Sequence, residues 1–213
     1  MAHRAWTVVA LLLGAARAEA RPVSYQGGWT VIEETDRQNT ALLVHYSPTN
    51  RVSVGLRSEW DRRADLLTNG VQATGLLHRW FGEDYQANLY ALGGIGATQA
   101  VDGSRRGSAP AGWIGGIADW ETRRFFVSYQ TRWMKSGDLT ESFTQSGRLG
   151  IAPYVANTGA LHTWFMIEFD QRTDLPDKVG VTPLLRFFTG SALLETGWSV
   201  TDNRPLVNFT YRF

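Results

Sequence analysis

The feature that most constrains the fold of this chain is a period of two in its side chains. The closing segment shows it well, because Val207, Phe209, Tyr211 and Phe213 alternate with more polar residues. Such alternation gives a β-strand one apolar and one polar face. About twelve such segments, separated by clusters of Gly, Asn, Asp, Pro and Ser, predict an all-β fold. The expected strands are 27–35, 40–47, 51–60, 71–81, 85–97, 111–121, 124–135, 143–155, 161–172, 181–189, 191–200 and 205–213.

The C-terminal aromatic pattern of Phe209, Tyr211 and Phe213 resembles the closing strand of bacterial outer-membrane β-barrels. In that class the terminal Phe is read by the barrel-assembly machinery, which would make this machinery a partner. The resemblance implies an antiparallel up-and-down transmembrane β-barrel of about 12 strands. It places the chain in the outer membrane of a Gram-negative bacterium.

Three short stretches also resemble an uncharacterised family of small proteobacterial outer-membrane proteins. They are 22–25, 45–48 and 151–154. This second resemblance implies no activity.

The beginning of the chain predicts export. Arg4 precedes an apolar run over 7–16, and Ala18-Glu19-Ala20 is a small-x-small cleavage pattern. We therefore expect a signal peptide over 1–20 and one barrel domain over 21–213. The chain has no cysteine, so neither a disulfide framework nor thiolate chemistry is expected.

The faces and the connections fit a membrane barrel. A membrane barrel turns its apolar faces outward and keeps its lumen polar. Aromatic residues gather at segment ends, as interfacial girdles do. The outer set would be Trp60, Trp133, Phe143 and Trp198, and the inner set Tyr46, Tyr85, Trp120 and Phe125. Connections at 48–50, 82–84, 122–123, 156–159 and 189–190 are predicted as short inner turns. The alternating connections at 61–70, 99–110, 136–142 and 173–180 are predicted as longer outer loops.

The charge balance excludes one partner class and suggests another. The chain has 21 Lys and Arg against 20 Asp and Glu, and the signal peptide would remove two arginines and one glutamate. The neutral mature chain lacks the basic footprint of nucleic-acid binding. Outer-membrane lipid and lipopolysaccharide are expected partners, and Arg62-Arg63 and Arg105-Arg106 could bind lipopolysaccharide phosphates. Solvated loop charge explains these pairs equally well, and the sequence leaves the oligomeric state open.

The inward faces would carry a network of charges. Its predicted members are Arg51, Arg57, Glu59, Asp119, Arg124, Arg132, Arg148, Glu168, Asp170, Arg172, Arg186, Glu195 and Arg212. Buried charges need partners, and the arginine fork can satisfy several acceptors. The sequence thus favours a largely filled lumen, with a narrow charged pore for small polar solutes as the alternative.

Three histidines raise the question of a metal site. His45, His78 and His162 lie near predicted inner turns, and His78 and His162 could face the lumen. Neutral imidazole is a common metal ligand. Convergence from such distant strands is unfavourable, so hydrogen bonding to carboxylates is favoured and no metal or other cofactor is predicted.

One short motif offers an enzymatic alternative. His45-Tyr46-Ser47 resembles the His and Ser pair of outer-membrane phospholipase A, in which the His serves as base for a nucleophilic Ser. That resemblance implies an outer-membrane lipid hydrolase. Here the pair precedes Pro48 at a predicted inner turn and lacks an orienting Asn on the next strand, so a packed His and a turn-flanking Ser are favoured. The prediction is a non-enzymatic barrel, with a lipid hydrolase or a soluble periplasmic ligand-binding barrel as alternatives.

Overall fold

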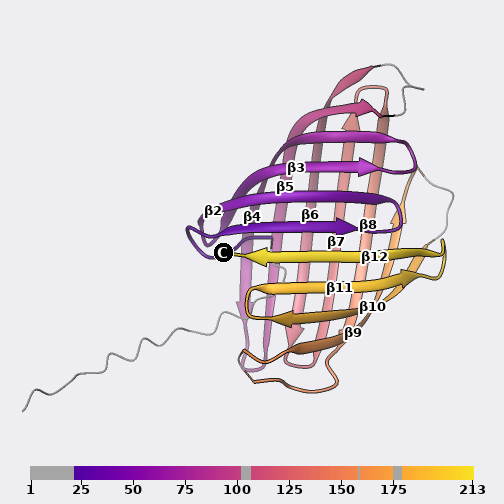
Figure 1. Ribbon diagram of the computed structural model, residues 1–213. Helices are drawn as coiled ribbons and strands as arrows, with labels where there is room; N and C mark the ends of the chain where they lie inside the picture. Colours follow the sequence, from indigo (N-terminus) through magenta and orange to yellow (C-terminus); the bar gives the residue numbers. More distant parts are fainter. Residues whose placement is uncertain (1–21, 102–106, 158, 175–178) are drawn as a thin grey trace, which may run out of the picture.

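Twelve antiparallel strands form a closed barrel in which β12 pairs with β1 (Figure 1). The computed structural model describes residues 22–101, 107–157, 159–174 and 179–213. The strands are β1 (Trp29–Thr35), β2 (Asn39–Thr49), β3 (Val52–Asp61), β4 (Leu66–Phe81), β5 (Tyr85–Ala100), β6 (Ser108–Thr122), β7 (Phe125–Ser136), β8 (Thr140–Ile151), β9 (His162–Arg172), β10 (Gly180–Thr189), β11 (Ala192–Ser199) and β12 (Arg204–Arg212). None of the described ranges holds a helix long and apolar enough to cross a membrane. The predicted fold class is confirmed.

The barrel has an inner end and an outer end. The inner end holds residues 22–28, the C-terminal Phe213 and the turns after the even-numbered strands, and the outer end lies opposite (Figure 1). The strands of the front and back walls cross steeply in this view, as tilted barrel strands do.

Strand bounds differ from the prediction mainly around β4–β6 and after β8. β4 and β5 each have 16 residues, so the expected outer loops at 61–70 and 99–110 shrink to 62–65 and 101–107. β8 ends at Ile151, and the connection over 152–161 is longer than the inner turn predicted at 156–159. The expected contrast between short inner turns and long outer loops is therefore wrong at these positions.

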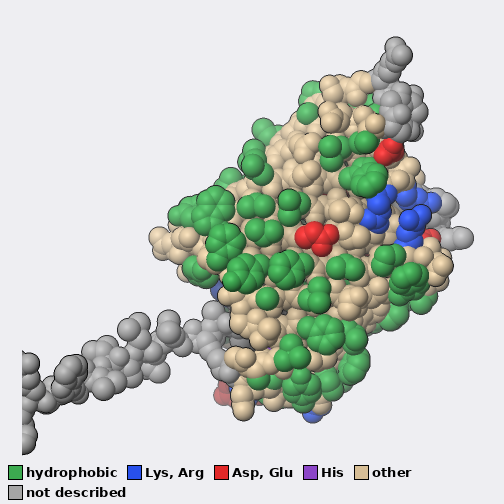
Figure 2. All heavy atoms as spheres, in the orientation of Figure 1, with side chains coloured by type: hydrophobic (Ala, Val, Ile, Leu, Met, Phe, Trp, Pro, Cys, Tyr) green, Lys and Arg blue, Asp and Glu red, His purple; other side chains and the backbone are tan. Residues whose placement is uncertain are grey.

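The surface of the barrel that faces outward is mainly apolar, and aromatic residues gather on it near both ends. Figure 2 shows apolar side chains spread over the visible face, with basic side chains gathered toward the outer end. Near that end Trp60 donates its indole N–H to Asp65, and Trp198 donates to Asn203, both at 2.9 Å. Glu33 is an acidic exception on the outward face of β1, where it accepts a hydrogen bond from Thr35.

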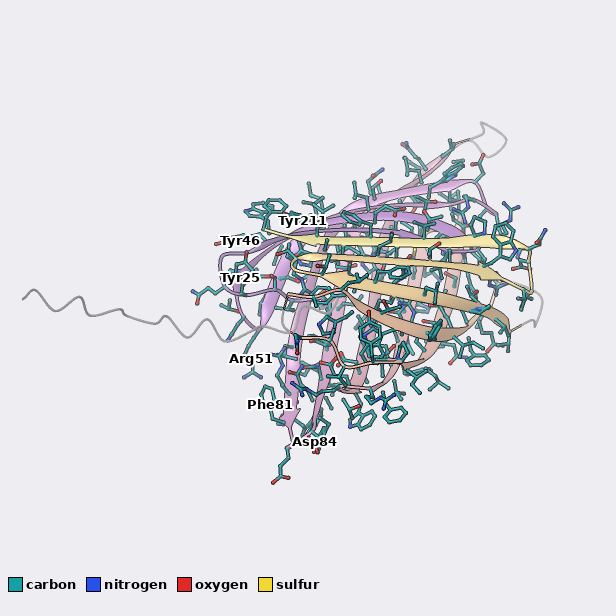
Figure 3. All side chains as sticks on the ribbon, turned by 60° about the horizontal axis from the view of Figure 1, so that its bottom comes forward. Tyr25, Tyr46, Arg51, Phe81, Asp84 and Tyr211 are labelled. Atoms are coloured by element: carbon teal, nitrogen blue, oxygen red, sulfur yellow. The ribbon has the colours of Figure 1, made fainter. Side chains whose placement is uncertain are left out.

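The inner end carries its own girdle of aromatic side chains. Trp29 and Tyr46 pack against each other with tilted rings whose centroids are 5.3 Å apart, and Tyr85 and Trp120 do so with centroids 6.3 Å apart. Tyr46 and Tyr211 lie at this end in Figure 3. Paired aromatic girdles are a feature of membrane barrels. The predicted inner and outer aromatic sets all lie on outward faces at the expected ends.

Phe213 takes part in closing the barrel. Its carbonyl accepts a hydrogen bond from the Trp29 amide at 2.8 Å, and its own amide donates to the Trp29 carbonyl at 3.1 Å. These bonds extend the β1–β12 ladder to the end of the chain. A closed ladder removes the unpaired strand edges that lipid could not satisfy.

Candidate functional site: the barrel lumen

An ion pair joins two walls of the lumen. Arg132 on β7 donates from both terminal guanidinium nitrogens to the two carboxylate oxygens of Glu59 on β3. Arg57, two residues before Glu59 on the same inward face, donates from Nε to the same carboxylate at 2.9 Å. Glu34 on β1 lies 3.8 Å from the Arg57 guanidinium. The bidentate geometry suits arginine and fixes both partners in orientation.

A second ion-pair cluster links β8–β12. Arg148 pairs with Glu168 and reaches Glu195 at 3.0 Å. Arg186 donates to the other oxygen of Glu195 at 2.7 Å, and the amide of Asn208 donates to Glu195 at 2.7 Å. Two guanidiniums and two carboxylates thus satisfy one another in a largely buried cluster, as buried charges require.

The loop between β1 and β2 closes part of the outer mouth. Arg37 in this loop is buried and bonds Asp170 on β9 at 2.7 Å and Asp202 between β11 and β12. Burial alone would lower the pKa of Arg37, but its bonds to these two aspartates outweigh burial and raise the pKa above its ordinary value. Gly180 makes room for the contact, because a Cβ there would collide with Asp170 and Arg37.

A further pair crosses the outer mouth between opposite walls. Arg172 on β9 bonds Asp61 on β3, and its Nε also lies 2.6 Å from Asp174. In the ring of strands, β3 and β9 are six positions apart. The outer mouth is therefore crossed by two arginines, Arg37 and Arg172.

The lumen wall over β4–β6 is filled by a tryptophan. The Trp113 indole lies against Gly94 and Gly70, where a Cβ at either glycine would collide with it. Its Nε1 donates to the side-chain oxygen of Gln72 at 3.0 Å. A large ring held by close glycines narrows the lumen and has a fixed orientation.

A small charged chamber lies inside the barrel. A cavity of about 260 Å³ lies between the Arg132 and Arg148 clusters, with Pro22 toward its inner end and Gln38 toward its outer end. Among the described residues, seven carboxylates and four guanidiniums line it. Glu34 and Asp36 are among these lining carboxylates, which outnumber the lining guanidiniums. The chamber is lined by charged and apolar side chains together and carries an excess of negative charge.

Most of the predicted network residues lie on inward faces. These are Arg57, Glu59, Asp119, Arg132, Arg148, Glu168, Asp170, Arg172, Arg186, Glu195 and Arg212. Two members were placed wrongly. Arg51 and Arg124 are exposed at inner turns, where they donate to backbone carbonyls such as those of Leu77 and Pro153. Turn geometry therefore overrides the strand alternation at these two positions.

Sequence reasoning missed several lumen residues, among them Glu34, Asp36, Arg37, Asp61 and Gln72. Arg37 belongs to a predicted loop, and nothing in the alternation indicates that the loop dips inward. Asp61 was assigned to a loop as well, because the predicted strand ended at residue 60. Gln72 is uncharged and so did not stand out among the inward residues. Arg105 and Arg106 lie outside the described residues, and Arg63 is exposed at the outer end.

The three histidines are not brought together. His45 faces inward on β2, and His162 contacts Phe188 with ring centroids 5.9 Å apart. His78 was predicted to face the lumen, but a bulge after Leu76 turns it outward. There its ring packs at a tilt against the Trp80 ring, with the two centroids 4.3 Å apart. Within the described ranges, no three His, Cys, Asp or Glu side chains are placed to hold a metal ion.

The His45 and Ser47 pair does not form a catalytic arrangement. Both side chains are fully buried. Ser47 Oγ accepts a hydrogen bond from the Ser24 amide at 3.0 Å, and neither ring nitrogen of His45 has a hydrogen-bond partner in the described part of the chain. A nucleophilic serine needs its hydroxyl bonded to the base and open to substrate. Neither condition is met here.

Comparison with known proteins gives a likeness in fold. No family model matches the chain, and no curated protein does. Similar solved structures include "KdgM porin", with a TM-score of 0.48 and 10% identity over 87% of this chain and 98% of that one. "KdgM porin in complex with disordered oligogalacturonate" has a TM-score of 0.48 and 12% identity over 87% and 99%. "LpxR from Salmonella typhimurium" has a TM-score of 0.46 and 9% identity over 87% and 99%. Function is therefore inferred from this chain's own residues.

Proposed function

We propose that this chain is a non-enzymatic outer-membrane barrel whose charged lumen is nearly closed and admits only small polar solutes. The membrane location is supported by the apolar outward faces, the two aromatic girdles and the closed ladder. A soluble barrel would bury its apolar faces and expose its charges. Here Leu56, Ile95 and Ile114 are among the most exposed residues, while Glu59 and Glu195 are buried.

The observation that carries the proposal is the set of ion pairs across the lumen. The Arg132–Glu59 and Arg172–Asp61 pairs join walls on different sides of the barrel. The remaining chamber of about 260 Å³ is smaller than the roughly 300–1,000 Å³ pockets that hold drug-sized ligands. Oligosaccharides and other large solutes would have to break several buried pairs to pass.

The sign of the chamber charge supports a preference among solutes. Carboxylates outnumber guanidiniums in the lining, and Glu34 is only weakly paired because it lies 3.8 Å from Arg57. Rings of acidic side chains favour cations in narrow pores. Small cations and neutral polar solutes are therefore the substrate class that fits best.

Uptake into proteoliposomes tests this function. We expect slow entry of methylammonium and no entry of sucrose, compared with liposomes that lack the protein. Rapid sucrose entry would overturn the closed lumen. Absence of any uptake would leave the filled barrel as a structural component of the membrane.

A further inference from the structure

The segment before β1 folds into the inner mouth of the barrel. Val23 and Ser24 are 4% and 7% exposed, whereas their neighbour Tyr25 is 56% exposed. Tyr25 lies at the same end as Tyr46 and Tyr211 in Figure 3. The segment therefore has one side turned into the lumen and one side turned away from it.

Apolar contact holds the inward side. Val23 packs against Leu76 on β4 and Tyr90 on β5, and Ile117 on β6 packs against this group. Burial of a valine side chain against three strands stabilises the closed position through the hydrophobic effect. Pro22, the next residue toward the N-terminus, lines the charged chamber. The segment thus lies between the chamber and the inner end.

Hydrogen bonds position the segment on β2 and β3. The Pro22 carbonyl accepts from Ser53 Oγ at 2.7 Å. Ser47 is the main anchor, because its Oγ accepts from the Ser24 amide and its carbonyl accepts from the Gly27 amide at 2.8 Å. Gly27 has a φ of +83°, a conformation that glycine adopts without strain.

Several polar atoms that are buried around the segment lack hydrogen-bond partners among the described residues. They include Ser24 Oγ, Thr30 Oγ1 and both ring nitrogens of His45. Thr30 and His45 are paired across the β1–β2 ladder, so these atoms gather at the inner end. Buried polar atoms without partners favour a state in which water reaches them. By contrast, Arg37 at the outer mouth is fixed by two carboxylates.

We propose that residues 22–28 form a displaceable plug, the inner plug, which controls access from the inner end to the charged chamber. The inner plug leaves as a unit when Val23 withdraws from Leu76 and Tyr90, with Gly27 and Gly28 serving as the hinge before β1. The proposal builds on the closed lumen inferred above, but access to the chamber can be measured without any transported solute.

A single reporter cysteine measures that access. The chain has no cysteine, and Gln130 on β7 lines the chamber. Gln130→Cys would be labelled in detergent micelles with a charged maleimide, in the parent chain and in two variants of the inner plug. Val23→Asp places a charge in the apolar contact, and Tyr25→Asp places the same charge on the exposed side.

We expect Val23→Asp to raise the labelling rate at position 130 by tenfold or more and Tyr25→Asp to leave it within twofold of the parent. Equal rates in the parent and Val23→Asp would overturn the inner plug, as would equal acceleration by both variants. A heat-modifiable gel shift verifies that each variant is folded. If Val23→Asp fails to assemble, Val23→Gly removes the same contact without adding a charge and is held to the same outcomes.

Solute uptake by the same variants separates the two proposals. If labelling rises in Val23→Asp but methylammonium enters with neither the parent nor the variant, the inner plug stands and the transport function falls. If uptake is present in the parent and labelling is the same in all three proteins, transport stands and the inner plug falls.

Discussion

Both terminal guanidinium nitrogens of Arg132 on β7 bond the two carboxylate oxygens of Glu59 on β3, across the interior of the barrel. Strands β4–β6 separate the two residues along the wall, so the pair ties the lumen across its width. Arg132→Met removes the cation but keeps much of the volume. Glu59 would then be left with Arg57 alone. We expect a loss of roughly 2–3 kcal/mol in unfolding free energy, below the ~3–5 kcal/mol of a fully broken buried pair.

The same strand offers a matched control for this change. Lys135 on β7 pairs with Glu141, and both side chains are about half exposed, at 51% and 54%. Lys135→Met should therefore change stability little, because water and salt screen such a pair. Urea titration followed by the heat-modifiable gel shift compares the two variants. Equal losses would show that the Arg132 pair is as exposed to water as the Lys135 pair.

Neighbouring glycines on β5 should respond differently to the same substitution. Gly94 faces inward, where a Cβ would collide with the Trp113 indole, while a Cβ on Gly93 would meet nothing closer than 3.6 Å. Gly94→Ala should cost roughly 1–3 kcal/mol through overpacking and should disturb the Trp113–Gln72 hydrogen bond. Gly93→Ala should be tolerated. Thermal unfolding and near-ultraviolet circular dichroism measure both effects, and a reversed order would refute the assigned faces.

Alternation separated the charged face from the apolar face in the regular strands for which both faces were assigned. Arg132, Glu168 and Glu195 were assigned inward because a membrane barrel keeps its polar faces inside, and they lie on inward faces in the structure. The rule failed at His78 because the bulge after Leu76 inserts one residue and inverts the faces beyond it. No residue in that stretch signals the bulge. A one-residue shift moves every later side chain to the opposite face.

Residues outside the strands were not predictable from periodicity. Arg37 enters the lumen from a loop, and residues 22–28 fold into the inner mouth. Their positions depend on partners far away in sequence, such as Asp170 for Arg37 and Ser53 for Pro22. Arg51 and Arg124 have the strand-facing pattern of lumen residues, yet they lie in turns and bond nearby carbonyls. Alternation therefore predicted the wall of the barrel but not the two closed mouths.

The terminal aromatic gives a prediction about assembly. Deleting Phe213 removes both the predicted recognition residue and two backbone hydrogen bonds to Trp29. We expect the amount of assembled barrel to fall several-fold in cells while export is unchanged. Val207→Ala, on the same outward face of β12, is the control and should assemble normally. The amount of the heat-modifiable form in membrane fractions measures assembly of both variants. Normal assembly of the deletion variant would refute the proposed recognition of Phe213 by the assembly machinery.

The burial of Ser47 predicts the outcome of a hydrolase assay. Ser47 is fully buried and serves as an anchor for the Ser24 amide. Purified protein and Ser47→Ala should both fail to hydrolyse phospholipid or lipid A in detergent. Turnover by the parent that disappears in Ser47→Ala would restore the enzymatic alternative.

Planar-bilayer recording of the unmodified protein tests the closed lumen most directly. Ion pairs across the outer mouth and residues 22–28 at the inner mouth lie on either side of the small chamber. We predict a closed baseline with small, brief openings. In a KCl gradient, the reversal potential should indicate selectivity for the cation. Steady, large conductance without cation preference would contradict the account and indicate a wide, water-filled porin.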